Sequence, residues 1–151
     1  MSCFVAWMGG KIFSCIMKKV AAIALASGFD FAHATEIGRI EFQPHSGLSI
    51  VVRDVYGQSA CAVSFEAILG FRVLDELYLM EYWPGCSTKN GWLFLIQQGG
   101  WADQERSRSG TCLHGLHPDV KEYLVTGINE CVSVFSLEAP AVKSAFDHEQ
   151  R

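Results

Sequence analysis

Apolar and polar residues alternate with a period of two along much of the chain. The clearest alternation lies in three runs, residues 37–43, 48–55 and 60–74. Because successive side chains of a strand point to opposite faces, each run predicts a strand with one buried face. The third run is long enough for one strand, or for two strands broken near Gly70. Together the three runs predict an antiparallel meander.

Two further regions indicate strands. Residues 91–97 (GWLFLIQ) form a continuous apolar run closed by two glycines, which is typical of a buried strand. Residues 123–126 and 131–137 flank a turn-like segment, 127–130, and predict a β-hairpin. Between these regions, residues 101–108 are charged and predict a short helix or a loop.

The pattern changes at residues 71–83 (FRVLDELYLMEYW). Asp75 is a good N-cap residue and Glu76 suits the positive end of a helix, so a helix of about two turns is expected, stopped by Pro84 and Gly85. Helical spacing places Leu77, Met80 and Trp83 on one side, which we expect to join the core. The acidic and aromatic side chains of the segment 71–83 are candidates for binding a partner, because aromatic residues anchor interfaces and carboxylates attract basic groups. The predicted partner-binding residues are Asp75, Glu76, Tyr78, Glu81 and Tyr82.

These elements predict a single α+β domain, mainly antiparallel β-sheet with one or two short helices. The predicted domain spans residues 36–143, between a leader at 1–35 and a polar tail at 144–151. At 151 residues and half apolar, the chain is long enough for one core. No uninterrupted apolar run reaches the roughly 18 residues of a membrane-spanning helix, so stable membrane insertion is not expected.

The leader has two interpretations. From Met17 it reads as a basic start, an apolar stretch and a small-residue cleavage site ending at Ala34, which are the parts of a secretory signal. Sixteen residues precede Met17, however, and Asp30 interrupts the apolar stretch. The alternatives are a first helix of the domain or a start codon placed too far upstream. We therefore expect a cytoplasmic protein, or a periplasmic or secreted one if residues 17–34 act as a signal peptide.

The net charge and the spacing of the cysteines limit the classes of function that this chain can have. The formal net charge is −4, which argues against a nucleic-acid surface and suits a basic partner. None of the six cysteines forms a C-x-x-C pair. Four cysteines lie beyond the leader and allow two disulfides if the protein is exported, although Cys61 and Cys131 lie in apolar runs where buried free thiols are common.

Candidate catalytic and metal-binding residues are sparse. Cys112, His114, His117 and Asp119 are capable of binding a metal, but Gly115 and Pro118 favour a surface loop and no second ligand cluster follows. A nucleophile at Cys86 or Cys112 with His114, or an acid–base pair of Glu66 and Glu81, lacks a supporting motif. No catalytic residue, metal site or cofactor is therefore predicted.

Three segments of the chain resemble a known family of proteins: FRVLDELYLMEYW (71–83), GGWADQE (99–105) and EYLVTGINECVSVFSLEAP (122–140). They resemble small bacterial immunity proteins encoded beside polymorphic or contact-dependent toxins. The resemblance implies a cytoplasmic inhibitor that binds one cognate toxin domain, often a basic nuclease, and blocks its active site. It implies no catalytic residues. The alternative function is an exported small domain with a structural or adaptor role in the envelope.

Overall fold

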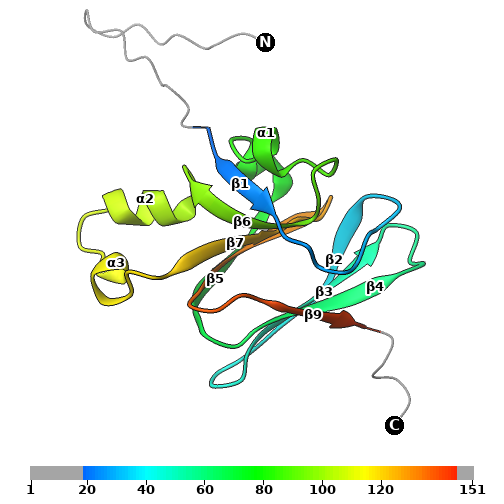
Figure 1. Ribbon diagram of the computed structural model, residues 1–151, viewed down its shortest axis with the longest axis horizontal. Helices are drawn as coiled ribbons and strands as arrows, with labels where there is room; N and C mark the ends of the chain where they lie inside the picture. Colours follow the sequence, from blue (N-terminus) through cyan, green and yellow to red (C-terminus); the bar gives the residue numbers. More distant parts are fainter. Residues whose placement is uncertain (1–18, 146–151) are drawn as a thin grey trace, which may run out of the picture.

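Two antiparallel sheets form the fold of residues 19–145, the part of the chain that the computed structural model describes (Figure 1). The five-stranded sheet has the order β1 (Ala21–Ala24), β6 (Leu93–Gln98), β7 (Lys121–Val125), β8 (Glu130–Ser136), β5 (Ile68–Asp75). The four-stranded sheet has the order β2 (Thr35–Gln43), β3 (Gly47–Asp54), β4 (Ala60–Phe65), β9 (Ala141–Ser144). The helical elements are short: η1 (Glu76–Leu79, a 3₁₀ turn), α1 (Trp83–Cys86), α2 (Trp101–Ser107) and α3 (Leu113–Leu116). The predicted α+β class, mainly antiparallel, is confirmed.

The central strands of the five-stranded sheet, β6, β7 and β8, are buried on both faces, whereas the edge strands β1 and β5 are largely half-buried or exposed. One face packs against the four-stranded sheet, and side chains from both sheets share a core cluster that includes Ile50, Val63 and Val134. The other face is covered by η1 and α1, around a second cluster that includes Leu79 and Phe94. Because both faces are covered there, β6 and β7 contain runs of consecutive apolar residues, Leu93–Ile96 and Tyr123–Val125, in place of a strict alternation.

Strand β7 shows how the two faces are divided. Tyr123 and Val125 belong to the cluster between the sheets, whereas Leu124 belongs to the cluster beneath η1 and α1. Glu122 shares the face of Leu124, since alternate residues of a strand point the same way. A carboxylate thus lies on the inner side of a helical layer, where it needs hydrogen-bond donors.

The predicted meander of β2, β3 and β4 is confirmed, but the long third run breaks earlier than Gly70. Strand β4 ends at Phe65 and β5 begins at Ile68, in the other sheet. The bend between them changes layers and resets which alternate residues are buried. The alternation within residues 60–74 places Leu69 and Val73 with the buried residues of a single long strand, but in the structure both are exposed.

The described fold begins before the predicted domain limit at residue 36. Strand β1 pairs with β6 at the edge of the five-stranded sheet, so this segment is a strand and not a first helix. After β1 the chain still contacts the core: the indole Nε1 of Trp92 donates to the Phe29 carbonyl at 3.0 Å, and Phe31 meets the Trp92 ring edge-on. Removal of residues 17–34 as a signal peptide stays a prediction, and its first two residues lie outside the described range.

The polar tail also begins later than predicted. Strand β9 pairs with β4 as far as Ser144, so residue 144 belongs to the sheet. Residues 146–151 of the predicted tail lie outside the described residues. Within residues 19–145, none of the helices has the length and apolar character needed to cross a membrane.

Candidate docking surface and the buried network beneath it

The 71–83 segment folds as two short elements where one helix was expected. Asp75 is the N-cap of η1, as predicted, and its carboxylate accepts from the Leu77 backbone N–H at 2.9 Å. Pro84, predicted to stop the helix, instead lies in the first turn of α1. A proline fits there because the first backbone N–H groups of a helix have no partner within it.

Two of the three residues predicted to join the core, Leu77 and Met80, lie on the surface instead, whereas the third, Trp83, packs partly buried against the second cluster. Leu79, Tyr82 and Cys86 are fully buried, whereas Leu77 and Met80 are 72% and 57% exposed. A 3₁₀ turn has three residues per turn, and the turn that follows η1 shifts the phase again. An unbroken α-helical spacing therefore assigned Leu77 and Met80 to the wrong side.

Four of the five predicted partner-binding residues reach the surface. Tyr78 is 75% exposed and Asp75 is exposed, while Glu76 and Glu81 are half-buried. Tyr82 is completely buried, so its assignment to the surface was wrong. Its hydroxyl makes hydrogen bonds inside the molecule instead.

An apolar groove adjoins η1 and α1. Its volume is about 380 Å³, and its apolar walls are Leu77, Met80 and Trp83 on one side and Ile128 of the β7–β8 turn on the other. Glu76 lines its edge. Sequence reasoning predicted the hairpin turn but missed Ile128, because no local pattern shows that the turn lies beside η1.

Three carboxylates stand close together beside this groove. Asp75 and Glu130 are directly opposite each other on β5 and β8, and Glu76 follows Asp75 in the chain. Burial raises the pKa of the Cys131 thiol to about 11, and the charges of Glu76, Asp75 and Glu130 add to that rise. No Lys, Arg or His of residues 19–145 forms an ion pair with these three carboxylates. Like charges opposite each other in a sheet are unfavourable, so the arrangement favours an approaching cation.

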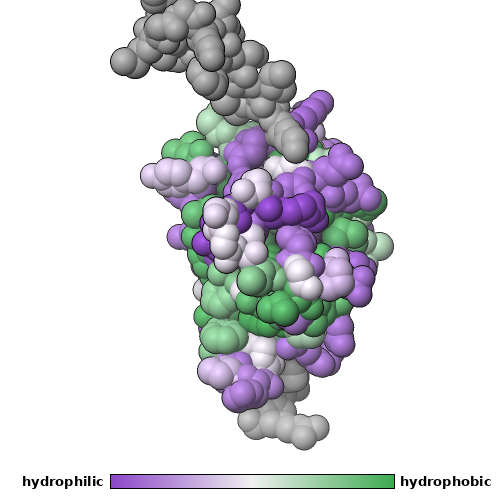
Figure 2. Space-filling view, turned by 90° about the vertical axis from the view of Figure 1, so that its left-hand side faces the viewer, coloured by the Kyte–Doolittle hydropathy of each residue, from purple (hydrophilic) through white to green (hydrophobic). Residues whose placement is uncertain are grey.

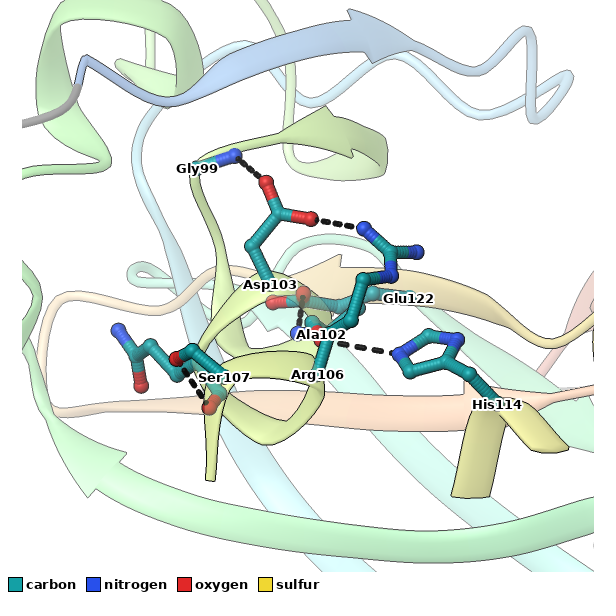
Figure 3. A network of polar contacts seen from close by, with 8 residues as sticks. Gly99, Ala102, Asp103, Arg106, Ser107, His114 and Glu122 are labelled. Carbon is teal, nitrogen blue, oxygen red and sulfur yellow. Dashed lines mark hydrogen bonds and ion pairs between the residues drawn. The ribbon is translucent and has the colours of Figure 1, made fainter. Parts of the chain in front are cut away.

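Below the helical layer, Glu122 and Tyr82 form a buried hydrogen-bond network. The Tyr82 hydroxyl donates to Glu122 Oε1 at 2.7 Å and accepts from the Trp101 backbone N–H at 2.8 Å. The other carboxylate oxygen, Oε2, accepts from the Ala102 backbone N–H at 2.7 Å, a contact seen in Figure 3. The network therefore ties the first turn of α2 to the five-stranded sheet.

Burial raises the pKa of Glu122 above its ordinary value, while the hydrogen bonds from Ala102 and Tyr82 oppose the rise. Burial and the nearby Glu122 charge likewise raise the pKa of Tyr82. Arg72 adds a cation at the edge of the network: its Nη2 donates to the Tyr82 hydroxyl at 3.3 Å, and its guanidinium lies over the Trp101 ring. With only 1% of Glu122 exposed, this network anchors α2 and offers no access to a substrate.

The surface around α2 differs from the groove because its charges are paired. Asp103 accepts from the Gly99 backbone N–H and forms an ion pair with Arg106 (Figure 3). Arg108 pairs with Glu105 at 2.7 Å. Hydrophilic side chains cover the upper half of this end of the molecule and apolar ones gather lower down (Figure 2). Paired charges exert little attraction on a charged partner.

The residues predicted as possible metal ligands do not form a site. The expected loop contains the one-turn helix α3, and His114 Nε2 lies 3.0 Å from the Ala102 carbonyl (Figure 3). Within residues 19–145, no three His, Cys, Asp or Glu side chains are grouped so that they could hold a metal.

The two carboxylates considered as an acid–base pair are separated. Glu66 follows β4 of the four-stranded sheet, whereas Glu81 lies between η1 and α1, which cover the far face of the five-stranded sheet. Burial raises the pKa of the Cys86 thiol to about 12, which makes it a poor nucleophile. Cys61, Cys86, Cys112 and Cys131 are all free thiols, so the described residues contain no disulfide of an exported domain.

Comparison of the chain with models of protein families, with curated proteins and with solved structures finds no match.

Proposed function

We propose that this chain is a binding protein of the immunity type, which neutralises a cognate toxin domain by occluding its active site. We define its docking surface by the exposed groove residues Leu77, Met80 and Ile128, by Tyr78, and by the acidic group Asp75, Glu76 and Glu130. The choice of a toxin as partner comes from the resemblance to immunity proteins, which lies in residues 71–83, 99–105 and 122–140. The docking surface indicates how such a partner is bound.

One observation carries the proposal: large apolar side chains are exposed beside carboxylates that form no ion pair within residues 19–145. Leu77, Tyr78 and Met80 are each more than half exposed. Leu77 and Met80 line the same groove, and exposed apolar groups gathered in this way mark interaction sites. Asp75 and Glu130 lie opposite each other on neighbouring strands, and no cation in the described part of the chain pairs with either. A partner with an apolar anchor flanked by Lys or Arg satisfies both features.

The charge arrangement also suggests how association proceeds. Carboxylates at the rim of an interface speed the encounter with a basic partner, while buried apolar anchors slow its dissociation. Occlusion of the toxin's active site then requires no chemistry from this chain. A basic nuclease domain is the partner class that best fits these charges.

The decisive test is co-purification of the chain with the toxin domain encoded by the adjacent gene, followed by rescue of cells that express this toxin. A 1:1 complex and survival of the cells are expected. Strong expression of both proteins without a complex would refute the proposed function.

Matched substitutions test the docking surface. Leu77→Asp is expected to weaken toxin binding at least tenfold, because it places a charge at the centre of an apolar contact. Leu116→Asp in α3 is the control, since Leu77 and Leu116 are 72% and 73% exposed. Titration calorimetry with the purified toxin domain measures both affinities. Equal affinities for the two variants would place the interface elsewhere while leaving the immunity function intact.

A further inference from the structure

His33 and Asp54 form a hydrogen-bonded pair in the four-stranded sheet. His33 lies just before β2, and Asp54 is the last residue of β3. His33 Nδ1 lies 3.1 Å from Asp54 Oδ2, and the Asp54 side chain is only 2% exposed. The second carboxylate oxygen, Oδ1, accepts from the Tyr56 backbone N–H at 2.9 Å. The Tyr56 ring meets the imidazole edge-on at 4.6 Å between centroids. The imidazole is thus held by a carboxylate that is itself held in place.

This arrangement determines which imidazole nitrogen is free. The hydrogen bond from Tyr56 lowers the pKa of Asp54 below its ordinary value, and the contact with His33 lowers it further, so the carboxylate is ionised at neutral pH. An ionised carboxylate only accepts hydrogen bonds, which places the hydrogen of a neutral imidazole on Nδ1. The lone pair is then on Nε2. No residue in the described part of the chain hydrogen-bonds to Nε2, and 45% of the side chain is exposed.

His33 lines a polar pocket of about 250 Å³. The opposite wall comes from the loop after α1, including Thr88 and Lys89. Lys89 is exposed and forms no ion pair with any residue between 19 and 145. The pocket therefore brings together the imidazole, the Lys89 ammonium, the carboxylate of Asp30, which also lines it, and room for a small molecule. An imidazole beside a water-accessible pocket is the group that general-base hydrolysis requires.

We propose that His33, positioned by Asp54, acts as a general base in the hydrolysis of small acyl esters in this pocket. His33 Nε2 removes a proton from water while the water oxygen forms a bond to the ester carbonyl carbon, and the carbonyl electron pair moves to its oxygen beside the Lys89 ammonium. That pair then returns, the bond to the leaving oxygen breaks, and the leaving oxygen takes the proton from Nε2. Ester and water give acid and alcohol, with no other reactant.

This activity is separate from the proposed inhibition of a toxin. It uses none of the docking-surface residues, although Thr88 lines both the pocket and the groove. Sequence reasoning missed the pair because His33 lies in the predicted leader and Asp54 lies near the end of a strand, 21 residues away. The sequence contains no motif that joins them.

The test is the hydrolysis of p-nitrophenyl acetate by the purified full-length chain. We expect His33→Ala to lower kcat/KM about 100-fold, the range typical of general-base catalysis, and His45→Asn, on an exposed turn of the same sheet, to leave it unchanged. Added imidazole is expected to restore hydrolysis by the His33→Ala variant, which a purely structural role of His33 does not predict.

His33→Asn provides a second variant if His33→Ala fails to fold, because its amide still donates to Asp54 but has no lone pair in place of Nε2. Circular dichroism and thermal unfolding confirm the fold of each variant. The proposal is overturned if the folded His33 variants hydrolyse the ester as fast as the native chain. It is equally overturned if imidazole accelerates the His33→Ala variant no more than the native chain.

Discussion

Tyr82 and Glu122 show how a single pair of residues joins two layers. One is buried beneath η1 and α1, the other lies on β7, and their 2.7 Å hydrogen bond connects the helical layer to the sheet. A buried carboxylate is tolerated only when donors surround it. Here the donors are the Tyr82 hydroxyl and the Ala102 backbone N–H. The pair therefore fixes the position of α2 at the cost of burying a charge.

This burial predicts a pH dependence of stability. Because the folded-state pKa of Glu122 is raised above its ordinary value of 4.5, the folded protein binds more protons than the unfolded chain between 4.5 and the raised value. The free energy of unfolding therefore falls as the pH rises through this window. Glu122→Gln cannot titrate, so we expect its stability to fall less than that of the native chain over this range.

Urea denaturation at several pH values from about 4.5 to neutral tests this expectation. All other titrating groups are common to both proteins, so the difference between the two curves isolates Glu122. Parallel curves would show that Glu122 does not titrate within the window.

Individual residues also show which features of the structure could be predicted from the sequence. Asp75 was predicted as an N-cap, and the structure confirms it because capping depends on neighbouring residues alone. Tyr82 was assigned to the surface and is buried, since its environment depends on Glu122, 40 residues away. His33 and Asp54 are likewise distant in sequence. Local chemistry was predictable, whereas pairs of side chains brought together by the fold were not.

At the scale of elements, the connection from β6 to α2 depends on a close approach. A Cβ atom added at Gly100 would lie 2.6 Å from Glu122 Oε2 and 2.6 Å from Ile96 Cγ2. Gly100 is also the N-cap of α2. The absence of a side chain at this position lets the first turn of α2 come close enough for its N–H groups to reach the buried network.

Gly100→Ala is therefore expected to destabilise the protein by about 1–3 kcal/mol, the usual cost of overpacking. Gly115→Ala is the matched control: a Cβ there meets no atom within 4 Å, and Gly115 lies in α3. We expect the control to be neutral or slightly stabilising, because Ala favours helices. Chemical denaturation of both variants measures the difference, and equal stabilities would contradict the close packing at Gly100.

The strands were more predictable than the helices for a physical reason. Buried and less buried residues alternate through most of β3 and all of β4, which are eight and six residues long, so errors at single positions do not change the pattern. In β2 the alternation is interrupted where the register shifts between Ile37 and Arg39. The elements η1 and α1 have four residues each, too few for a period to be established. Strand β1 was hidden because its apolar composition equally fits a signal peptide.

At the scale of the whole molecule, β1 closes one edge of the five-stranded sheet. It covers the edge of β6, and Leu25, Phe29 and Phe31 pack against the core between the sheets. An uncovered β6 edge presents unpaired backbone groups, which destabilise the fold and promote association. Residues 19–34 are thus structural in the described fold, whatever their role in targeting.

A chain that starts at Thr35 is accordingly expected to be less stable than one that starts at Lys19 by more than about 3 kcal/mol, from the loss of three partly buried apolar side chains. Thermal unfolding and size-exclusion chromatography of the two chains measure the effect, and aggregation of the shorter chain is the expected accompaniment. Equal stability of the two chains would show that β1 contributes little to the fold.

The spacing of buried residues in η1 and α1 affects how the binding specificity of such a chain can change in evolution. Leu79, Tyr82 and Cys86 anchor this segment, while Leu77, Tyr78 and Met80 contribute little to the core. If these exposed residues bind the partner as proposed, substitutions there change specificity at small cost in stability. Duplicated copies of such a chain can then acquire new partners one residue at a time while the fold persists.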